Sequence, residues 1–312
     1  MSTIPASGNI STLAQELLVQ LLNRTLLCVH DILNEAARNF ADAGIPSPRL
    51  DAEILLSFCL SCDRIDFIKN PATPVDAETL AAFRQLAARR LAWEPVAYIT
   101  GRKEFWSFVL EVNRSVLIPR PDTEVLVEEA LNVSRQRNLE EIRILDIGTG
   151  SGAIALALAS EIPTARLTAT DISGAALATA SRNARNLNLH RQIEFLQGDL
   201  FEPVDGFFDI IVANPPYIAD EEYEKLPAGV KNYEPAAALL AGVEGLDFYR
   251  KIVAAAPGYL KDNAWILLET GSTQSTPIGE IFASSGQYSY ISIRNDYAGL
   301  PRVIKARRKI SG

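Results

Sequence analysis

The spacing of hydrophobic positions changes near residue 141. Beyond it, short apolar runs alternate with segments whose apolar residues recur at helical spacing. We expect strands at 142–147, 165–170, 192–196, 207–213, 264–269, 288–294 and 302–306, and helices at about 152–160, 173–187, 245–260 and 274–284. This alternation predicts an α/β fold with a doubly wound sheet and crossover helices.

The region before residue 93 has a different pattern. Its apolar residues recur at helical spacing, as in Val29, Leu33, Ala36 and Phe40, and it contains no strand pattern. Polar residues interrupt the leucine-rich run at 13–27, which predicts an amphipathic helix and not a membrane span. Breaks fall at 44–48 and 70–74, and a further helix is expected at 77–91. We therefore predict an all-helical N-terminal domain over residues 1–92.

Residues 93–120 look like a β-hairpin linker between two domains. Two β-rich runs, 105–112 and 116–118, flank the turn-forming residues 113–115. Pro119 and Pro121 fix a loop after the second run. Asp122 and Glu124 follow near the start of a helix expected at 123–136, where they suit the helix dipole or could contact a ligand's amine. The remaining residues, 121–312, form the predicted α/β domain.

The stretch Asn214-Pro215-Pro216-Tyr217 directly follows the apolar run 207–213. Two prolines cannot continue a strand inside a sheet, so the chain must turn there. In open α/β sheets, ligands bind at the carboxyl ends of strands. Asn-Pro also commonly just starts a turn. The amide and the ring on a rigid turn nevertheless favour a holder for a flat, amide-like or amine-bearing group.

Three further strand ends carry residues suited to a nucleotide-like ligand. The first strand leads into Gly148-Thr149-Gly150-Ser151-Gly152, whose backbone can approach a ligand closely at a helix N-terminus. Asp171 ends the second strand and can accept ribose hydroxyls, or it can cap the next helix. Asp199 and Leu200 follow the third strand and can contact an adenine, although Asp199 alone could be a turn residue. Together these strand ends predict a pocket for an adenosyl ligand. The spacing of the glycines does not favour a dinucleotide.

Composition narrows the classes of function. The 312 residues are 48% hydrophobic and 22% charged, which is ordinary for a globular protein with a sizeable core. The net charge of -8 argues against nonspecific binding to nucleic acid. Three cysteines and two histidines do not supply a zinc ligand set, and Cys59 and Cys62 are expected to be buried in a helix. No signal peptide is visible, and the cysteine count fits a reducing cytoplasm.

Several motifs resemble the peptide chain release factor glutamine methyltransferases, the HemK/PrmC family. The similar stretches are Gly44–Glu53, Tyr98–Gly101, Glu104–Trp106, Leu117–Glu124, Asn214–Tyr217, Tyr233–Pro235, Gly245–Tyr249 and Asp296–Arg302. Their order and spacing agree from about residue 30 to 308. The resemblance implies a Rossmann-like class I methyltransferase that uses S-adenosylmethionine.

The same resemblance implies the reaction and its residues. The enzyme would methylate the side-chain amide of the glutamine in the Gly-Gly-Gln loop of class 1 peptide chain release factors. The implied catalytic residues are Asn214, Pro215, Pro216 and Tyr217. The implied donor-binding residues are Gly148, Thr149, Gly150, Ser151, Gly152, Asp171, Asp199, Leu200, Asn214, Phe105 and Pro119. We expect a cytoplasmic monomer without metal, membrane or nucleic-acid contacts, whose helical domain grips another part of the release factor.

Two other functions remain open from the sequence. An adenine-amino methyltransferase acting on DNA or RNA would use the same Asn-Pro-Pro-Tyr turn, and the basic tail from Arg302 to Lys309 is its best support. That tail is equally typical of an edge strand protected by charges. A non-catalytic adaptor would show a degenerate glycine loop or would lack Asn214, and neither is seen.

Overall fold

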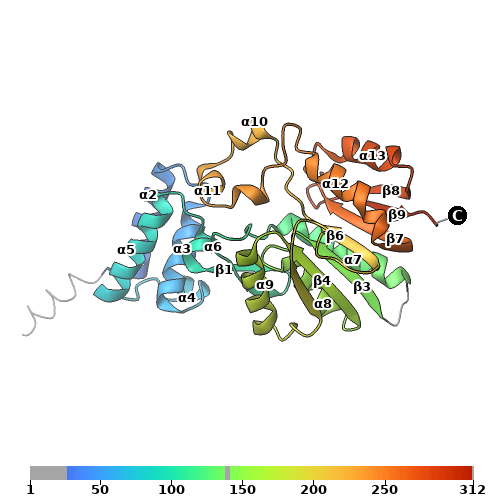
Figure 1. Ribbon diagram of the computed structural model, residues 1–312. Coiled ribbons are helices and arrows are strands. Elements are labelled where there is room, and N and C mark those ends of the chain that lie inside the picture. Colours follow the sequence, from blue (N-terminus) through green and yellow to red (C-terminus); the bar gives the residue numbers. More distant parts are fainter. Residues whose placement is uncertain (1–26, 138–140, 311–312) are drawn as a thin grey trace, which may run out of the picture. The chain divides into compact units, whose positions relative to one another are not determined.

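The computed structural model describes residues 27–137 and 141–310 (Figure 1). The helix expected at 13–27 therefore lies outside the described residues, except for Leu27. The chain divides into two compact units, one ending at Thr100 and the other beginning at Gly101. The predicted domain boundaries at 92 and 120 stay predictions.

The first unit is helical in its described part, as predicted. Its helices are α2 (Val29–Asp42), α3 (Pro48–Leu60), α4 (Ile65–Lys69), α5 (Ala77–Leu91) and α6 (Val96–Thr100). Pro48 stands in the first turn of α3, where its missing N–H costs no hydrogen bond. Asp76 caps α5 by accepting from the Thr79 N–H at 2.8 Å. Leu33 and Phe40 of α2 pack with Leu55 and other apolar residues in one core.

The second unit holds a seven-stranded sheet in the order β5-β4-β3-β6-β7-β9-β8 (Figure 1). Its strands are β3 (Ile142–Ile147), β4 (Ala165–Asp171), β5 (Ile193–Gln197), β6 (Phe208–Ala213), β7 (Leu260–Glu269), β8 (Tyr288–Asn295) and β9 (Pro301–Arg308). The strands from β5 to β7 are parallel, whereas β9 runs antiparallel to β7 and to β8. The predicted α/β sheet is confirmed, and the strand positions agree closely with the apolar runs.

Helices cover both faces of this sheet because successive strand residues point to opposite sides. The longer helices are α7 (Glu124–Arg137), α8 (Ala153–Glu161), α9 (Gly174–Asn186), α12 (Asp247–Ala255) and α13 (Ser275–Ser284). Ile144 packs in one core with residues of α7 and α8, and Leu145 packs in the other with residues of α12 and α13. Shorter turns are η1 (Pro121–Thr123), α10 (Asp220–Tyr223), α11 (Ala228–Lys231), η2 (Ala236–Ala238) and η3 (Ala256–Gly258).

The hairpin exists, but its predicted arms are wrong. Strand β1 (Arg102–Phe105) pairs with β2 (Phe108–Glu111) across a two-residue turn at Trp106 and Ser107. Trp106 has a positive φ of 56°, which lets the chain reverse within two residues. Asn113 does make the expected turn by accepting from the Ser115 N–H at 2.9 Å. The segment 116–118 after it joins no strand, so that turn closes no hairpin.

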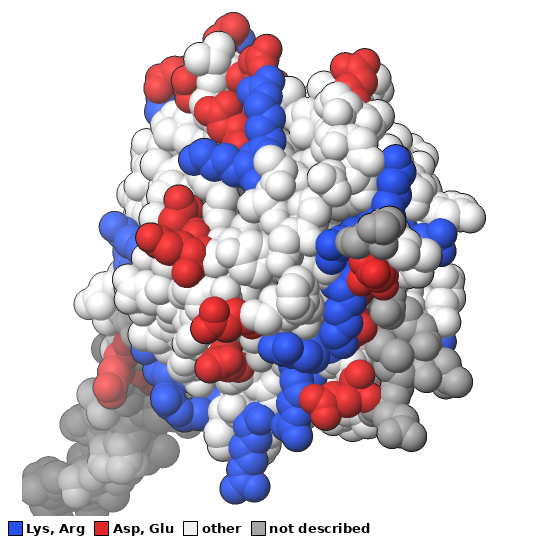
Figure 2. Space-filling view, turned by 45° about the vertical axis from the view of Figure 1, so that its right-hand side comes forward, with Lys and Arg blue, Asp and Glu red and all other residues white. Residues whose placement is uncertain are grey.

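The basic tail is also placed differently from the prediction of a protected edge strand. Strand β9 lies between β7 and β8, so it is an interior strand and β8 forms that edge. Three of its cations have polar partners: Arg302 pairs with Asp296, Lys305 pairs with Glu129, and Arg308 donates to the Leu260 carbonyl. Figure 2 shows Lys and Arg side chains on one face flanked by Asp and Glu.

A buried ion pair connects two helices of the first unit. Arg90 Nε donates to Asp51 Oδ2 at 2.8 Å, and both side chains are only about a tenth exposed. Arg90 also donates to the Glu94 carbonyl. Removal of one partner leaves the other charge buried without compensation, which is costly.

Asp51→Ala should therefore lower the free energy of unfolding by about 3–5 kcal/mol. Chemical denaturation followed by circular dichroism measures this loss. Glu53→Ala is the matched control, because Glu53 belongs to a more exposed pair with Arg49 and should cost less than about 1 kcal/mol. Equal losses in the two variants would contradict a structural role for the buried pair.

Candidate active site

Parallel pairing brings four chemically important chain segments to one edge of the sheet. Ile147 pairs with Thr170 on one side and with Ala213 on the other, and Ala213 pairs with Leu268. The residues that come next, among them Gly148, Asn214 and Glu269, therefore lie side by side at the carboxyl ends of the strands. This is the edge where open α/β sheets bind ligands.

The glycine loop after β3 presents open backbone. Gly148 and Gly150 have positive φ angles of 72° and 58°, and a Cβ atom on either would meet no atom within 4 Å. The N–H groups of Gly148 and Thr149 both donate to the Thr170 carbonyl at 2.9 Å, and the Gly150 N–H donates to Asp171 Oδ2 at 2.9 Å. The end of β4 thus holds the loop in place and leaves space above the two glycines.

The other loop residues face the protein. Thr149 Oγ1 donates to Asp146 at 2.6 Å, and the Ser151 carbonyl accepts from Asn183 at 2.9 Å. A side chain at Gly152 would stand 3.2 Å from the Ala180 Cβ. These three residues shape the loop through contacts with the chain itself, and a direct ligand contact by them stays a prediction.

Asp146 is a fully buried carboxylate beneath the loop. Its Oδ2 accepts from Thr149, whereas Oδ1 has no hydrogen-bond partner in the described part of the chain. Burial in the low-dielectric interior raises the pKa of Asp146 to about 7.

Asp171 and Asp199 have different surroundings. Asp171 accepts from the Gly150 N–H and, through its other oxygen, from the Ser173 N–H at 2.9 Å. Burial raises its pKa. The side chain that caps α9 is Ser173, which accepts from Ala176, so the alternative of Asp171 as that cap is wrong. Each Asp171 oxygen keeps a lone pair for a hydroxyl donor.

Asp199 is exposed, and Leu200 is half-buried. The Leu200 carbonyl accepts a hydrogen bond from the Thr170 hydroxyl.

The turn after β6 is held from several sides. Asn214 Nδ2 donates to Thr123 Oγ1 at 3.3 Å. The Tyr217 carbonyl accepts from Gln274 Nε2 at 2.9 Å. A Cβ on Gly245 would lie 2.5 Å from that carbonyl, so this close approach requires glycine. Pro215 is buried, whereas Pro216 and the Tyr217 ring are half-buried. Burial is the main cause that raises the pKa of Tyr217.

A second loop closes beside this turn. Glu234 is buried, accepts from the Ile118 N–H at 3.1 Å and pairs with Arg120, which fixes the backbone on both sides of the buried Pro119. Phe105 is 2% exposed and packs in the core of the unit. Donor contacts by Pro119 and Phe105 stay predictions.

The acids at the start of α7 have protein partners. Asp122 pairs with Arg302 at 3.0 Å, and Glu124 Oε1 accepts from the Trp106 N–H at 2.7 Å. Asp122 and Glu124 therefore stabilise the fold of the chain itself. Thr123, between them, is buried and reaches the Asn214 amide.

Sequence reasoning missed Glu269, which ends β7 next to the Asn214 turn. It is 1% exposed, and its Oε2 has no hydrogen-bond partner in the described structure. Burial raises its pKa to about 7. A carboxylate at the end of an apolar strand was the signal that could have found it.

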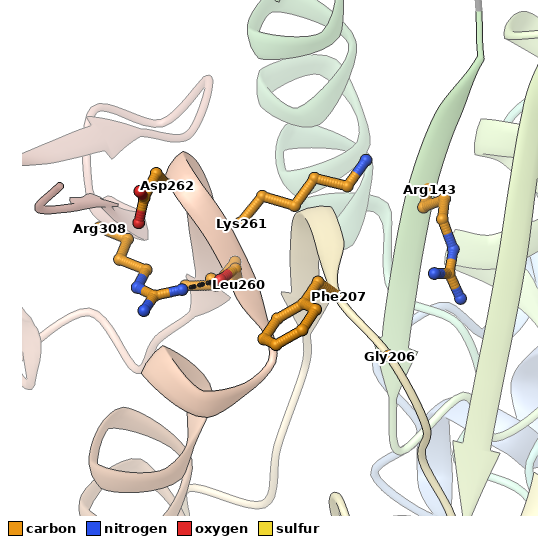
Figure 3. Close-up of a pocket in the computed structure, with 7 residues that line it drawn as sticks. All are labelled: Arg143, Gly206, Phe207, Leu260, Lys261, Asp262 and Arg308. Carbon is orange, nitrogen blue, oxygen red and sulfur yellow. Dashed lines mark hydrogen bonds between the residues drawn. The ribbon is translucent and has the colours of Figure 1, made fainter. Parts of the chain in front are cut away.

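One hollow of the second unit lies away from this edge. A hollow of about 460 Å³ at the amino ends of β3 and β7 is lined by Arg143, Gly206, Phe207, Leu260, Lys261, Asp262 and Arg308 (Figure 3). Its lysine is paired with Asp209 at 2.7 Å, and none of the four strand-end segments lines it. Volume alone therefore does not identify the site.

Residues 27–137 and 141–310 contain no cluster of three or more His, Cys, Asp and Glu side chains able to hold a metal ion. No helix in that part has the length and apolar character needed to cross a membrane. Cys59 and Cys62 are half-buried free thiols, and only Cys59 lies in α3, so the prediction that both are buried in a helix is wrong.

The residues present fit an adenosyl methyl donor. The open backbone at Gly148 and Gly150 and the remaining lone pairs of Asp171 lie along one edge of the sheet. The glycine backbone suits the amino-acid end of such a donor, and Asp171 suits its ribose.

The chain resembles known proteins over most of its length. The family model of the PrmC N-terminal domain matches residues 31–101, and that of the methyltransferase small domain matches residues 122–232. Release factor glutamine methyltransferases from Geobacter sulfurreducens and Vibrio cholerae are 42% and 43% identical, and each comparison covers 89% of this chain and 96% of the relative. The hMettl16 catalytic domain, solved with MAT2A 3'UTR hairpin 1, gives a TM-score of 0.54 at 16% identity, covering 82% of this chain and 93% of that one. That likeness shows the fold alone.

Asp146→Asn should make the thermal stability of the protein less dependent on pH. Between about pH 4 and pH 7 the folded carboxyl holds a proton that the unfolded one has lost, so wild-type stability falls as pH rises through this range. The melting temperature of the variant should fall less between pH 5.5 and pH 8. The exposed Asp205→Asn serves as control and should follow the wild type. Parallel curves for all three proteins would show that Asp146 does not titrate in this window.

Proposed function

The chain belongs to the family of release factor glutamine methyltransferases, and we propose that it methylates the glutamine side-chain amide in the Gly-Gly-Gln loop of class 1 peptide chain release factors. S-adenosylmethionine supplies an activated methyl group on a sulfonium. The observation that carries the proposal is the orientation of Asn214. Its Nδ2 is used on Thr123, so its Oδ1 is left as an acceptor at the carboxyl edge of the sheet.

The donor would be held by the strand ends. The open backbone of Gly148 and Gly150 would bind its amino-acid end, and Asp171 would accept from the ribose hydroxyls. Asp199 and Leu200 would contact the adenine. Thr149, Ser151 and Gly152 support the loop, and the segment around Pro119, with Phe105 behind it, would close over the donor.

The turn after β6 would hold the substrate amide. An amide nitrogen is a weak nucleophile because its lone pair is delocalised into the carbonyl. Asn214 Oδ1 and the Pro215 carbonyl would each accept one N–H, which aims the lone pair along the line of displacement. Pro216 stiffens the turn, and the Tyr217 ring would pack on the flat amide. The nitrogen then loses one proton to water, and no general base is required.

The proposal extends to partners and location. The helical domain would bind another part of the release factor, and the enzyme would act as a monomer in the cytoplasm, where translation terminates. Neither a membrane nor a nucleic acid is needed for this chemistry. Labelled donor offered separately with purified release factor and with DNA or RNA tests this choice. Label in the nucleic acid alone would favour the adenine-amino alternative, and label in neither would remove both activities.

Asn214→Ala should lower kcat for release-factor methylation by about 10²–10³, because a preorganised hydrogen-bonding group is lost. Calorimetry should give a donor affinity close to that of the wild type. Asn232→Ala, at an exposed asparagine, should leave both values unchanged. Wild-type turnover in Asn214→Ala would remove this residue from the mechanism.

Asp171→Ala should weaken donor binding by about tenfold or more, because a charge-assisted hydrogen bond of about 1.5–3 kcal/mol is lost. Titration calorimetry with S-adenosylhomocysteine measures the change. The exposed Asp205→Ala is the matched control. An unchanged affinity would limit Asp171 to holding the Gly150 and Ser173 backbone.

A further inference from the structure

The Gln274 side chain joins three loops of the second unit. Its Nε2 donates to the Tyr217 carbonyl at 2.9 Å and to the Gly245 carbonyl at 3.2 Å. Its Oε1 accepts from the Gly271 N–H at 3.2 Å. Gln274 stands directly before α13, so its amide connects the turn after β6 to the loop after β7 and to the loop before α12.

The three partners fix the orientation of the Gln274 amide. A reversed amide would place its oxygen against the carbonyl oxygens of Tyr217 and Gly245 and its NH₂ group against the Gly271 N–H, so all three contacts would be lost. The space is equally specific. A Cβ atom on Gly245 would lie 2.6 Å from Nε2, and a Cβ atom on Gly271 would lie 2.8 Å from Oε1. The amide therefore fills a space that only glycine neighbours leave open.

The Asn214–Tyr217 turn needs contacts of this kind. Its two prolines have no N–H, so the turn cannot be held through their backbone donors. The Tyr217–Ile218 peptide at its end is held on both sides. Gln274 donates to the carbonyl of this peptide, and the N–H donates to the Leu239 carbonyl at 2.9 Å. Gln274 thus fixes the end of the turn that carries the tyrosine ring.

We propose that Gln274 is a positioning residue for methyl transfer, which holds the Tyr217 end of the turn so that its ring and its acceptors meet the substrate amide together. This inference rests on the proposed function of the turn. The substrate nitrogen has to be aligned with the methyl donor, and small displacements of the aligning groups slow such reactions strongly. Gln274 bonds backbone groups of the chain itself, so its removal should lower kcat without weakening donor binding.

The first test is Gln274→Met, which keeps the length of the side chain and removes its hydrogen bonds. We expect kcat for release-factor methylation at saturating donor and substrate to fall about tenfold. The affinity for S-adenosylhomocysteine and the KM for the release factor should stay within about twofold of the wild type. A side chain that only filled space would be replaced by methionine without loss of kcat. Gln287→Met, at an exposed glutamine, is the matched control and should keep the wild-type kcat.

A double-mutant cycle tests the same contact from the other side. In Gly271→Ala the new methyl group would displace the Gln274 amide, because the nearest atoms that it would meet all belong to that side chain. We expect kcat to fall about tenfold in Gly271→Ala and in Gln274→Ala, and to fall no further in the double variant. Gly279→Ala in α13 is the control, since its Cβ would lie 3.9 Å from Ile304 Cδ1, and it should keep the wild-type kcat.

The outcomes separate this inference from the proposed function. A wild-type kcat in either Gln274→Met or Gly271→Ala, or additive losses in the double variant, would overturn the positioning role. If Gln274→Met melts below the assay temperature, the result for Gly271→Ala decides alone. A wild-type protein that transfers no methyl group to the release factor would instead overturn the proposed function.

Discussion

Everything at the site depends on the parallel pairing of β3, β4, β6 and β7. Parallel strands end at the same edge, so the Gly148 loop, Asp171, Asn214 and Glu269 are neighbours although up to 121 positions separate Gly148 from Glu269 in the sequence. The buried strands cannot shift by one residue without turning their apolar side chains away from the two cores. The positions of the functional groups are therefore fixed by hydrophobic packing far from the chemistry.

The second constraint is the low dielectric behind the Asn214 turn. Thr123 and Glu269 are buried behind this turn, so the hydrogen bond from Asn214 Nδ2 to Thr123 Oγ1 is electrostatically stronger than it would be in water. The same burial raises the pKa of Glu269 to about 7.

The sequence predicted what local patterns determine. Strands from Ile142 to Ala213 were found because buried parallel strands are short apolar runs, and the residues that follow them could be recognised as candidate ligand contacts. Prediction from the sequence failed where the structure depends on contacts between segments that are distant in the chain. Strand β9 was taken for an edge because strand order depends on which strands pair, and the hairpin arms were misplaced because Trp106 adopts a positive φ.

Glu269 shows the same limit at the site. Its place at the end of an apolar run made it a candidate, but only the pairing of Ala213 with Leu268 shows that it lies beside Asn214. A motif predicted ligand contacts for Thr149 and Ser151. In the structure the Thr149 hydroxyl donates to Asp146 and the Ser151 carbonyl accepts from Asn183, and the ligand contacts stay predictions.

The most direct test of the central claim is a crystal structure of the chain with S-adenosylhomocysteine and a class 1 release factor. We predict that the substrate glutamine Nε2 lies about 2.9 Å from Asn214 Oδ1 and from the Pro215 carbonyl, with Asn214 Nδ2 still on Thr123. A glutamine amide bound elsewhere, or an Asn214 amide with its nitrogen toward the substrate, would contradict the account.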